Sequence, residues 1–590
     1  TPLQNNNRYV NNPYWTAYQY EAGDKRDRML ASAILRYDFT DWLYLQGRVG
    51  TDWYTSRRRN LVPYGTGGRN ERYTELSELE IRQRETNAEF ILGMNKTLND
   101  IGISAFLGGN QMRRSFEQIG LEGERFQVPY FHSITNFSSD NLTPIFGQAE
   151  VGINSLFGSA EVSYKNLVFL TFTGRKDWFS TLDQQSNSVF YPSAGMSFVF
   201  SDAIELPSWF AFGKMRAAWS QVGGAPLNAY RTNLTYNVVG SHQGAILGSA
   251  NRNEVPNKNL KPLLVTEFEI GFDLRFLKNR IGLDVSYYNR KTTDDILSAT
   301  VSESTGFGSA AVNVGEMSNK GIELLLTGSP VVSAFKWDIS FNVARNTNEV
   351  LKLVDGLDVI ESDRSRTNRA FIHNRVGYPY SSIAGRQQKM INGQFVYNSD
   401  GFPVAEDSIV LLGTGVAPIT GGISNEFGYK NFNLSFLLGF QQGGKIHSGT
   451  NTLFYSNGLH KGTLPGRENG LTFTGMNTDG IQQEFNVPQD QLEDYYFDFA
   501  ARSSGNMVYS TDYIKLRSLV FGYSLPSKLI ENTPFSSVNL SFVARNLWLI
   551  YSDIENIDPE STYNNGNSQG LEYAGVPQSR TFGFNLKVKF

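Results

Sequence analysis

The residues that most often carry out chemistry in proteins are sparse and scattered in this chain. Its five histidines have no pair at the spacing of a metal site on one helix or one turn; they are His132, His242, His373, His447 and His460. All five fall in segments that we expect to be loops, where a solvated side chain is the simplest interpretation. Cysteine is absent, which excludes disulfides, thiolate zinc sites and cysteine nucleophiles.

Three glycine-containing patterns suggest binding sites, but each has a simpler explanation. Residues Gly306–Ala311 resemble a dinucleotide fingerprint, yet no strand–helix–strand unit surrounds them, which favours a loop tip. Residues Asn398–Gly401 and Asn477–Gly480 place oxygens beside a turn glycine as calcium loops do, but neither has a full ligand set, which favours Asx turns.

Enzyme motifs are missing as well. No nucleophile elbow and no Walker loop occurs, and a pair of catalytic carboxylates requires a geometry that sequence does not give. The sequence therefore predicts no catalytic residue, no cofactor and no metal, and we expect the protein not to be an enzyme.

The composition limits the remaining classes. Lys and Arg total 53 against 57 Asp and Glu, so no basic surface for nucleic acid is expected. No run approaches the roughly 18 apolar residues of a membrane-spanning helix. The 56 Gly, 29 Tyr and 41 Phe favour strands and turns over helices. The protein is therefore either soluble or enters a membrane with strands.

Alternation of apolar and polar residues recurs along the whole chain. In the last ten residues, Phe582, Phe584, Leu586, Val588 and Phe590 fall on one face of a strand, and polar residues or glycine fall on the other. The segments 336–343, 433–441 and 537–545 show the same pattern. Each of these segments is predicted to be a strand with one apolar face.

We count about 17 such strands, most of them of 9 to 14 residues, which is long enough to cross a bilayer when tilted. They begin near residues 28, 43, 79, 101, 156, 168, 190, 213, 265, 281, 315, 336, 419, 432, 513, 537 and 580. Six tryptophans lie near predicted strand ends, as in the aromatic girdle of a membrane barrel: Trp42, Trp53, Trp178, Trp209, Trp337 and Trp548.

The connections between these strands alternate in length. Long ones fall at about 57–78, 115–155, 180–189, 224–264, 295–314, 348–418, 446–512 and 551–579, with short turns between them. An outer-membrane barrel has this arrangement, with periplasmic turns and extracellular loops. A soluble sandwich or propeller has no reason to sort its loops by side.

The predicted fold is therefore an all-β, transmembrane antiparallel β-barrel. An odd count of 17 strands places residues 1–27 on the extracellular side if the chain ends in the periplasm. Bacterial single-chain barrels have an even number of strands, and an open sheet would expose unpaired backbone groups to lipid. We therefore expect further strands from an upstream segment or another chain.

Short motifs spread along the chain resemble one family. They are Asn11–Trp15, including Asn12, Pro13 and Tyr14; the Arg-rich Asp24–Met29; Tyr37–Leu45; Tyr191–Gly195; Lys214–Trp219; Asn257–Pro262; Asn319–Glu323; Tyr513–Arg517; Ala544–Leu547; Asp558, Pro559 and Glu560; and the terminal Phe590. In this order they resemble the mid-barrel and carboxy-terminal regions of the SusC/RagA family, which are TonB-dependent outer-membrane transporters.

The resemblance implies a 22-stranded barrel, of which about five strands would lie upstream. Residues 1–590 would then be the carboxy-terminal portion of the β-barrel domain, and the plug domain and first strands would lie outside this chain. Cleavage within a loop, a divided gene product and a fragment would each explain this.

The resemblance also implies a function: import of an oligosaccharide or peptide nutrient across the outer membrane, beneath a SusD-like lipoprotein lid. TonB would act through a plug that is not in this chain. The alternative is a SusC-like barrel that serves as a structural or protein-export component of an outer-membrane complex. Long loops would be extracellular, and short turns and the carboxy terminus periplasmic.

Two sets of residues are candidates for contacts within such a transporter. The polar faces of the strands would line the lumen with Asp338, Asn342, Asn539, Arg545 and Lys587; the alternative is that these residues only solvate the lumen or contact a plug. The two longest loops carry aromatic residues that could bind sugar rings or the lid, or could instead build small local cores: Tyr378, Tyr380, Tyr397, Phe454 and Tyr455.

Overall fold

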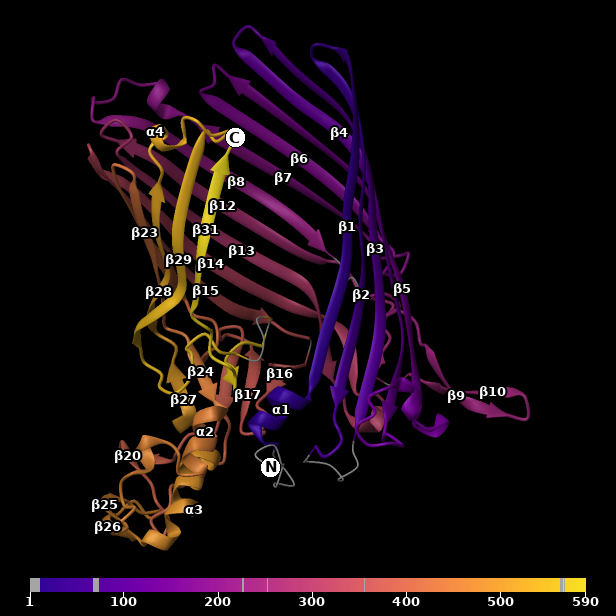
Figure 1. Ribbon diagram of the computed structural model, residues 1–590, viewed down its shortest axis with the longest axis vertical. Coiled ribbons are helices and arrows are strands. Elements are labelled where there is room, and N and C mark those ends of the chain that lie inside the picture. The colour runs from indigo at the N-terminus through magenta and orange to yellow at the C-terminus, as the bar shows by residue number, and fades with distance from the viewer. Residues whose placement is uncertain are drawn as a thin grey trace.

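The structure, a computed structural model, describes residues 11–66, 74–224, 228–251, 253–354, 356–562, 566 and 568–590. Its main element is an 18-stranded sheet that curves into a barrel-shaped wall (Figure 1). Seventeen of these strands pair antiparallel in chain order: β1 (Glu21–Thr40), β2 (Leu43–Val62), β3 (Glu75–Leu98), β4 (Ile101–Glu124), β5 (Leu142–Tyr164), β6 (Val168–Phe179), β7 (Ser188–Phe198), β8 (Phe210–Gly224), β12 (Leu263–Phe276), β13 (Ile281–Thr300), β14 (Ser309–Val332), β15 (Phe335–Lys352), β22 (Ile419–Tyr429), β23 (Phe432–Gln442), β28 (Tyr513–Ser524), β29 (Ser537–Ser552) and β31 (Thr581–Lys589).

The predicted antiparallel sheet is confirmed, since each predicted segment coincides with one of these strands. Two details were wrong. Many strands exceed the expected 9 to 14 residues, and β3, β4 and β14 have 24 each. The sheet also contains a short parallel strand, β11 (Glu254–Val255), which pairs with the start of β14.

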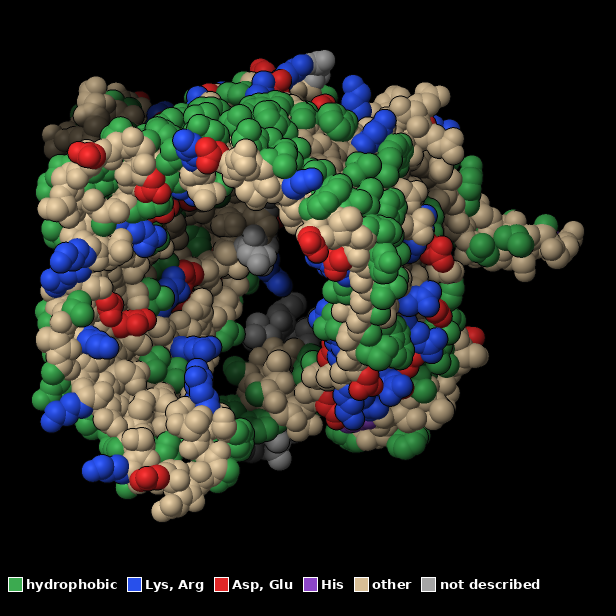
Figure 2. Space-filling view, turned by 90° about the horizontal axis from the view of Figure 1, so that it is seen from above, with side chains coloured by type: hydrophobic (Ala, Val, Ile, Leu, Met, Phe, Trp, Pro, Cys, Tyr) green, Lys and Arg blue, Asp and Glu red, His purple; other side chains and the backbone are tan. Residues whose placement is uncertain are grey.

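Residue type separates the two faces of the sheet. On one face aromatic rings contact one another across neighbouring strands, as where Phe542 lies 6.2 Å from Phe582 and 5.8 Å from Phe584. The other face is polar and surrounds an opening through the molecule, with charged side chains on its wall (Figure 2). Lipid outside and water inside explain this sorting.

Charged residues outside the apolar band explain the extra strand length. On the outward face of β1, apolar and aromatic residues extend from Met29 to Phe39. At about 3.3 Å per residue and a tilt of about 40°, this stretch spans roughly 25 Å, the height of a barrel's apolar belt. Further along the same face, Arg57 and Arg82 pair with Glu80 at 3.0 and 2.7 Å. The strands therefore continue beyond the belt into water.

The first and last strands are edges. All 20 residues of β1 are exposed, and within the described part of the chain β1 pairs in the sheet with β2 and β31 pairs with β29. Figure 1 shows them as neighbouring borders of the wall. Both edges are open to further pairing.

Short turns and long connections lie at opposite ends of the wall, and the carboxy terminus lies at the short-turn end (Figure 1). Tight turns such as Lys430–Asn431 use a positive φ, here 53° at Lys430. The short helix α4 (Ser527–Ile530) lies in the connection from β28 to β29. No helix among the described residues is long and apolar enough to cross a membrane.

The long connections contain secondary structure that the sequence analysis did not anticipate. The amino-terminal segment forms α1 (Pro13–Gln19). The other elements are β9 (Tyr236–His242), β10 (Ala245–Ala250), β16 (Val359–Arg364), β17 (Ala370–Arg375), β18 (Ser382–Gly385), β19 (Met390–Ile391), β20 (Gln394–Phe395), β21 (Val410–Thr414), β24 (Lys445–Ser448), α2 (Gly449–Ser456), β25 (Leu471–Met476), β26 (Gln482–Val487), α3 (Leu492–Phe497), β27 (Val508–Ser510) and β30 (Leu571–Glu572).

Candidate functional site

The five residues predicted to line a lumen share one face of the sheet. Asn539 lies opposite Lys587, and Arg545 lies opposite Ser518. From Ser518 the pairing continues through Leu437 and Ser424 to Ser340, which shares its face of β15 with Asp338 and Asn342. Residues that sequence places far apart therefore belong to one continuous surface.

That surface contains a recess of about 700 Å³ on the inner wall. Its polar lining includes Arg216, Asp284, Glu323, Asn342 and Arg517, each from a different strand. Gly422 and Gly439 form part of its floor. The recess brings one predicted lumen residue, Asn342, together with charged groups that the sequence analysis did not single out.

A cluster around Arg216 borders the recess. The guanidinium donates to both carboxylate oxygens of Asp284 at 2.8 and 3.1 Å and to Ser286 Oγ at 2.5 Å. To reach them from β8 it crosses β12 at Gly271, where a Cβ atom would lie 2.7 Å from Arg216 Cζ. The glycine therefore permits an ion pair between two strands that are not neighbours.

A second cluster joins two sequence motifs. Lys515 Nζ donates to Asp558 at 2.6 Å and to Glu560 at 2.7 Å, and Arg517 donates to both oxygens of Glu560 at 2.5 and 2.7 Å. Tyr513 OH donates to Glu560 Oε1 at 2.8 Å. The Tyr513–Arg517 motif on β28 thereby holds the Asp558–Glu560 motif of the connection after β29 against the wall.

The electrostatics of Glu560 follow from these contacts. Burial opposes its ionisation, but hydrogen bonds from Arg517, Lys515 and Tyr513 outweigh burial and lower its pKa to about 2. Glu560 is therefore a permanent anion at neutral pH.

Three long connections, residues 353–418, 443–512 and 553–580, fold together into what we call the loop module. Ala370, Ile372, Ile383 and Leu571 form one of its small cores. The buried Glu572 accepts hydrogen bonds from Ser448 at 2.9 Å and Thr450 at 2.5 Å. At Gly415 a Cβ atom would lie 2.1 Å from the carbonyl oxygen of Gln569, so two of the connections meet there through backbone.

The aromatic loop candidates divide into two groups. Tyr380 packs against the cluster of Val350, Leu353 and Ile360, and burial raises its pKa to about 12. Tyr397 lies 4.7 Å from the ring of Phe473, and Tyr455 stacks on His460 at 4.2 Å. These three side chains build small local cores, the alternative raised from the sequence.

The other two aromatic candidates are more accessible. Tyr378 is 43% exposed, with Arg375 over its ring at 5.2 Å. Phe454 is partly buried, and its carbonyl accepts from the backbone of Leu459 and His460. Contacts of Tyr378 and Phe454 with a substrate or a lid remain a prediction.

The family motif at the amino terminus has a structural role. Asn12 caps α1 by accepting from the backbone of Tyr14 at 2.9 Å, and Pro13 occupies the first helical turn. Trp15 donates to Thr66 Oγ1 at 3.2 Å, which holds the helix against the connection after β2. Phe590, at the other end of the chain, is 87% exposed and contacts Phe535.

The interpretation of the histidines as solvated loop residues was wrong for His447 and His460, and His373 lies partly buried on β17. His447 lies on β24 and is fully buried, and neither of its ring nitrogens has a hydrogen-bond partner among the residues that the structure describes. Burial lowers its pKa to about 4. His460 is also buried and packs against Tyr455. Alternation does not reveal this, because the loop module buries both residues through long-range contacts.

The two patterns that resemble calcium loops form ordinary turns. Among the residues that the structure describes, no group of three His, Asp or Glu side chains could hold a metal ion. Asn398 accepts from the backbone of Asp400 and Phe402, and Asn477 accepts from Asp479 and Ile481, so both calcium-like patterns are Asx turns.

Comparison with known proteins gives consistent matches. A family model described as TonB dependent receptor-like, beta-barrel, matches residues 1–383. TonB-dependent receptor P3 of Formosa agariphila is 27% identical over 98% of this chain and 60% of the relative, and TonB-dependent receptor SusC of Bacteroides thetaiotaomicron is 24% identical over 74% of this chain and 43% of the relative.

Among solved structures, the RagAB peptide transporter superposes with a TM-score of 0.79 at 18% identity, covering 98% of this chain and 63% of the matched one. This likeness shows the fold. The chain spans about three-fifths of the length of the first curated relatives it matches.

Proposed function

Because the chain belongs to the TonB-dependent receptor-like β-barrel family, we propose that it forms part of the barrel of an outer-membrane nutrient importer. The resemblance to SusC and RagA noted from the sequence is confirmed. We propose further that residues 1–590 are the carboxy-terminal portion of one barrel domain. The exposed edges of β1 and β31 support this, since the bilayer core does not tolerate unpaired backbone.

The inner recess is the observation that carries the proposal. Cationic, anionic and amide groups converge there on the face that surrounds the opening, from Arg216, Glu323 and Asn342 among others. Such a wall exchanges hydrogen bonds with hydroxyl and amide groups, and oligosaccharides and peptides are rich in both. A plug upstream of this chain, coupled to TonB, would open the path past it.

We propose that the loop module is extracellular and that a SusD-like lipoprotein covers it. The module projects from the long-loop end of the barrel (Figure 1). Leu459, Leu464 and Ile481 are 71%, 60% and 61% exposed on it, and exposed apolar side chains on a projecting module suit a protein partner. The short turns and the carboxy terminus would then be periplasmic.

Transport is tested with the full-length protein in cells that lack the native copy. Uptake of labelled oligosaccharides and peptides is measured with and without functional TonB. We expect uptake to require TonB. We expect it to fall several-fold in the variant Asn342→Leu, whose side chain fills the recess, while the amount of protein in the outer membrane stays normal. Asn539→Ala, on the same face outside the recess, serves as control.

Two results would contradict import. One is uptake of no oligosaccharide or peptide at normal protein levels. The other is a lumen permanently occupied by a protein partner, which would favour the structural or export role.

The lid is tested separately by co-purification of a lipoprotein from outer membranes. We expect the triple variant Leu459→Ser, Leu464→Ser and Ile481→Ser to lose the lipoprotein. Leu529→Ser is the matched control, because Leu529 is 68% exposed in the β28–β29 connection at the short-turn end. Equal loss of the lipoprotein in both variants would contradict the proposed binding surface on the loop module.

A further inference from the structure

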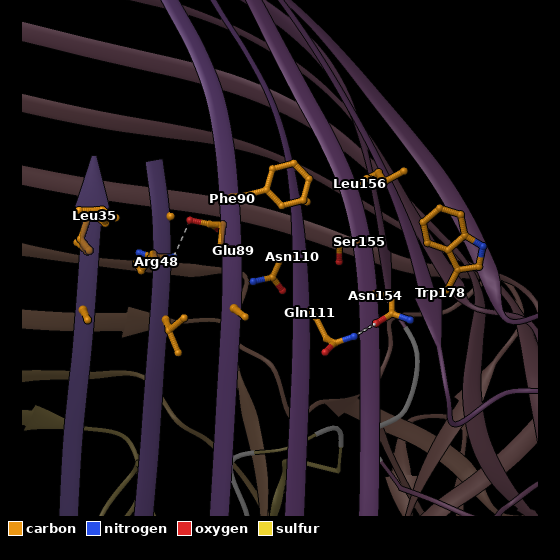
Figure 3. A pocket seen from close by; sticks show the side chains of 16 residues that line it. Leu35, Arg48, Glu89, Phe90, Asn110, Gln111, Asn154, Ser155, Leu156 and Trp178 are labelled. Carbon is orange, nitrogen blue, oxygen red and sulfur yellow. Dashed lines mark hydrogen bonds and ion pairs between the residues drawn. The ribbon is translucent and has the colours of Figure 1, made fainter. Parts of the chain in front are cut away.

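The outward face of β1–β6 carries a groove of about 750 Å³ (Figure 3). Its floor is made of small residues, Ala33, Gly47, Ala88 and Gly109, and larger apolar side chains border it, namely Leu35, Phe90, Leu156 and Trp178. Figure 3 shows Phe90, Leu156 and Trp178 projecting beside it. The groove is a depression in the otherwise convex apolar belt.

The strand register shows on which face of the sheet the groove lies and at which level of the apolar belt. One row of paired residues crosses all six strands: Ala33, Val49, Ala88, Gln111, Asn154 and Trp178. The opposite face at this position carries the Arg48–Glu89 ion pair at 3.3 Å. On the long-loop side of this row, the outward residues are largely polar or charged. The groove therefore lies where the apolar belt ends and water begins. Tryptophan side chains favour this level of a membrane protein.

A second recess, of about 720 Å³, adjoins the groove on the long-loop side and shares Asn154 and Trp178 with it. Its lining is polar and includes Arg84, Arg113 and Tyr230. The apolar groove and the polar recess therefore join at the edge of the apolar belt.

The two arginines differ from their neighbours on this face. Arg59 and Arg82 pair with Glu78 and Glu80 at 2.8 and 2.7 Å. Within the described part of the chain, neither Arg84 nor Arg113 has a carboxylate within 4.0 Å, although both are exposed. Arg113 donates to the carbonyl of its neighbour Met112 and lies across Gly152, where a Cβ atom would be 2.4 Å from its Nη1.

The other charged groups leave the recess positive. Glu150 also lines it, while Arg114 is neutralised by Glu85 at 2.7 Å. Lys176 adds a further cation beside Trp178, 5.2 Å from its ring. A dianionic or monoanionic phosphate would therefore find unmatched positive charge at the membrane surface.

We propose that the groove and the recess together bind an acylated membrane lipid with a phosphorylated head group. One acyl chain fills the groove between Phe90 and Leu156, and the phosphate accepts hydrogen bonds from Arg84 and Arg113. With the orientation proposed above, this lipid belongs to the outer leaflet. Its binding is independent of transport, so the two proposals fail separately.

The test measures lipid retained by the full-length protein after purification in detergent and transfer to nanodiscs of phosphatidylethanolamine with a minor fraction of phosphatidylglycerol or lipid A. Native mass spectrometry counts the bound lipid. We expect Arg84→Gln with Arg113→Gln to weaken retention of the phosphorylated lipids at least ten-fold, as loss of charge-assisted hydrogen bonds predicts. Arg57→Gln is the control, because that exposed arginine pairs with Glu80.

A second variant tests the groove itself. Gly47→Leu fills it without a clash, because a Cβ atom at Gly47 would have no heavy atom within 4 Å. We expect it to lower lipid retention, whereas Ala160→Leu, at an exposed outward residue outside the groove, leaves retention unchanged.

Three outcomes would overturn the proposal. Equal retention by wild type and both variants would exclude the site. Arginine-dependent binding of inorganic phosphate with no preference among lipids would assign the recess to a free anion. Self-association that Gly47→Leu abolishes at unchanged lipid retention would assign the groove to a second copy of the chain.

Discussion

Replacement of Glu560 by glutamine tests how the loop module is held to the barrel. The substitution keeps the shape of the side chain but removes the charge that Lys515 and Arg517 share. In the variant, the ammonium of Lys515 keeps only Asp558 as a carboxylate partner, and the Lys515 side chain is buried, with 7% of it exposed. Loss of one partner from a buried ion pair is costly because the other charge stays desolvated.

The magnitude follows from the pKa of Glu560. A fall from 4.5 to about 2 corresponds to roughly 3 kcal/mol of stabilisation at neutral pH. Because the Glu560 side chain is still 22% exposed, we expect about 2–3 kcal/mol for the variant. With a factor of ten for each 1.4 kcal/mol, local opening should increase roughly 30- to 140-fold.

The assay is hydrogen exchange of the peptides around 513–517 and 553–562 in the detergent-purified protein. Glu555→Gln is the control, because Glu555 pairs with the exposed Lys461 and such surface pairs contribute less than about 1 kcal/mol. We expect faster exchange in Glu560→Gln and nearly wild-type exchange in Glu555→Gln. Equal exchange in the two variants would refute the reasoning.

The pH dependence gives a second check. The pKa of Glu560 is lower in the folded protein than in the unfolded chain, so its stabilisation is fully present above about pH 4.5 and is lost as the pH falls toward 2. Wild-type protection of these peptides should persist at pH 5.5. Its loss between pH 7 and 5.5 would show that another group holds the module.

Three further substitutions test the facing and close packing of the wall. Phe542→Arg puts a charge on the lipid face at a cost of roughly 2 to 4 kcal/mol and should impair membrane assembly, measured by heat-modifiable electrophoretic mobility. Asn539→Ala, on the opposite face, should assemble normally. Normal assembly of both variants would contradict the assigned facing of the strand. Gly271→Ala should displace Arg216 from Asp284 and lower the melting temperature, whereas Gly195→Ala, whose Cβ would have its nearest neighbour at 3.9 Å, should not. Gly415→Ala should separate two connections of the loop module and expose them to protease, and unchanged digestion would argue against backbone contact there.

Much of the wall could be predicted because the face on which a strand residue lies depends only on its position in the alternating pattern. The alternation in 537–545 and 581–590 placed Asn539 and Lys587 on one face, and the register pairs them directly. The Pro13 that follows Asn12 also carries a signal for a helix start that the sequence analysis did not use.

The loop module could not be predicted in the same way. Tyr380, Tyr397 and His447 occupy segments without a regular period, and their burial depends on connections that lie far apart in the chain. Residue type alone suggested solvated histidines, and it left open whether the aromatic residues bind a ligand or build small local cores. The clusters that enclose these side chains form only when the three connections meet.

The sequence by itself determined the fold class, the approximate positions of the antiparallel strands of the wall and the side on which long connections fall, since alternation and turn residues act within a few positions. Only the tertiary structure decided which distant groups meet. Glu560 finds Lys515 and Arg517 across 45 and 43 positions of sequence, and the recess joins Arg216 to Arg517 through the curvature of the sheet. The curvature of the sheet brings such groups together, and no local pattern encodes their distance.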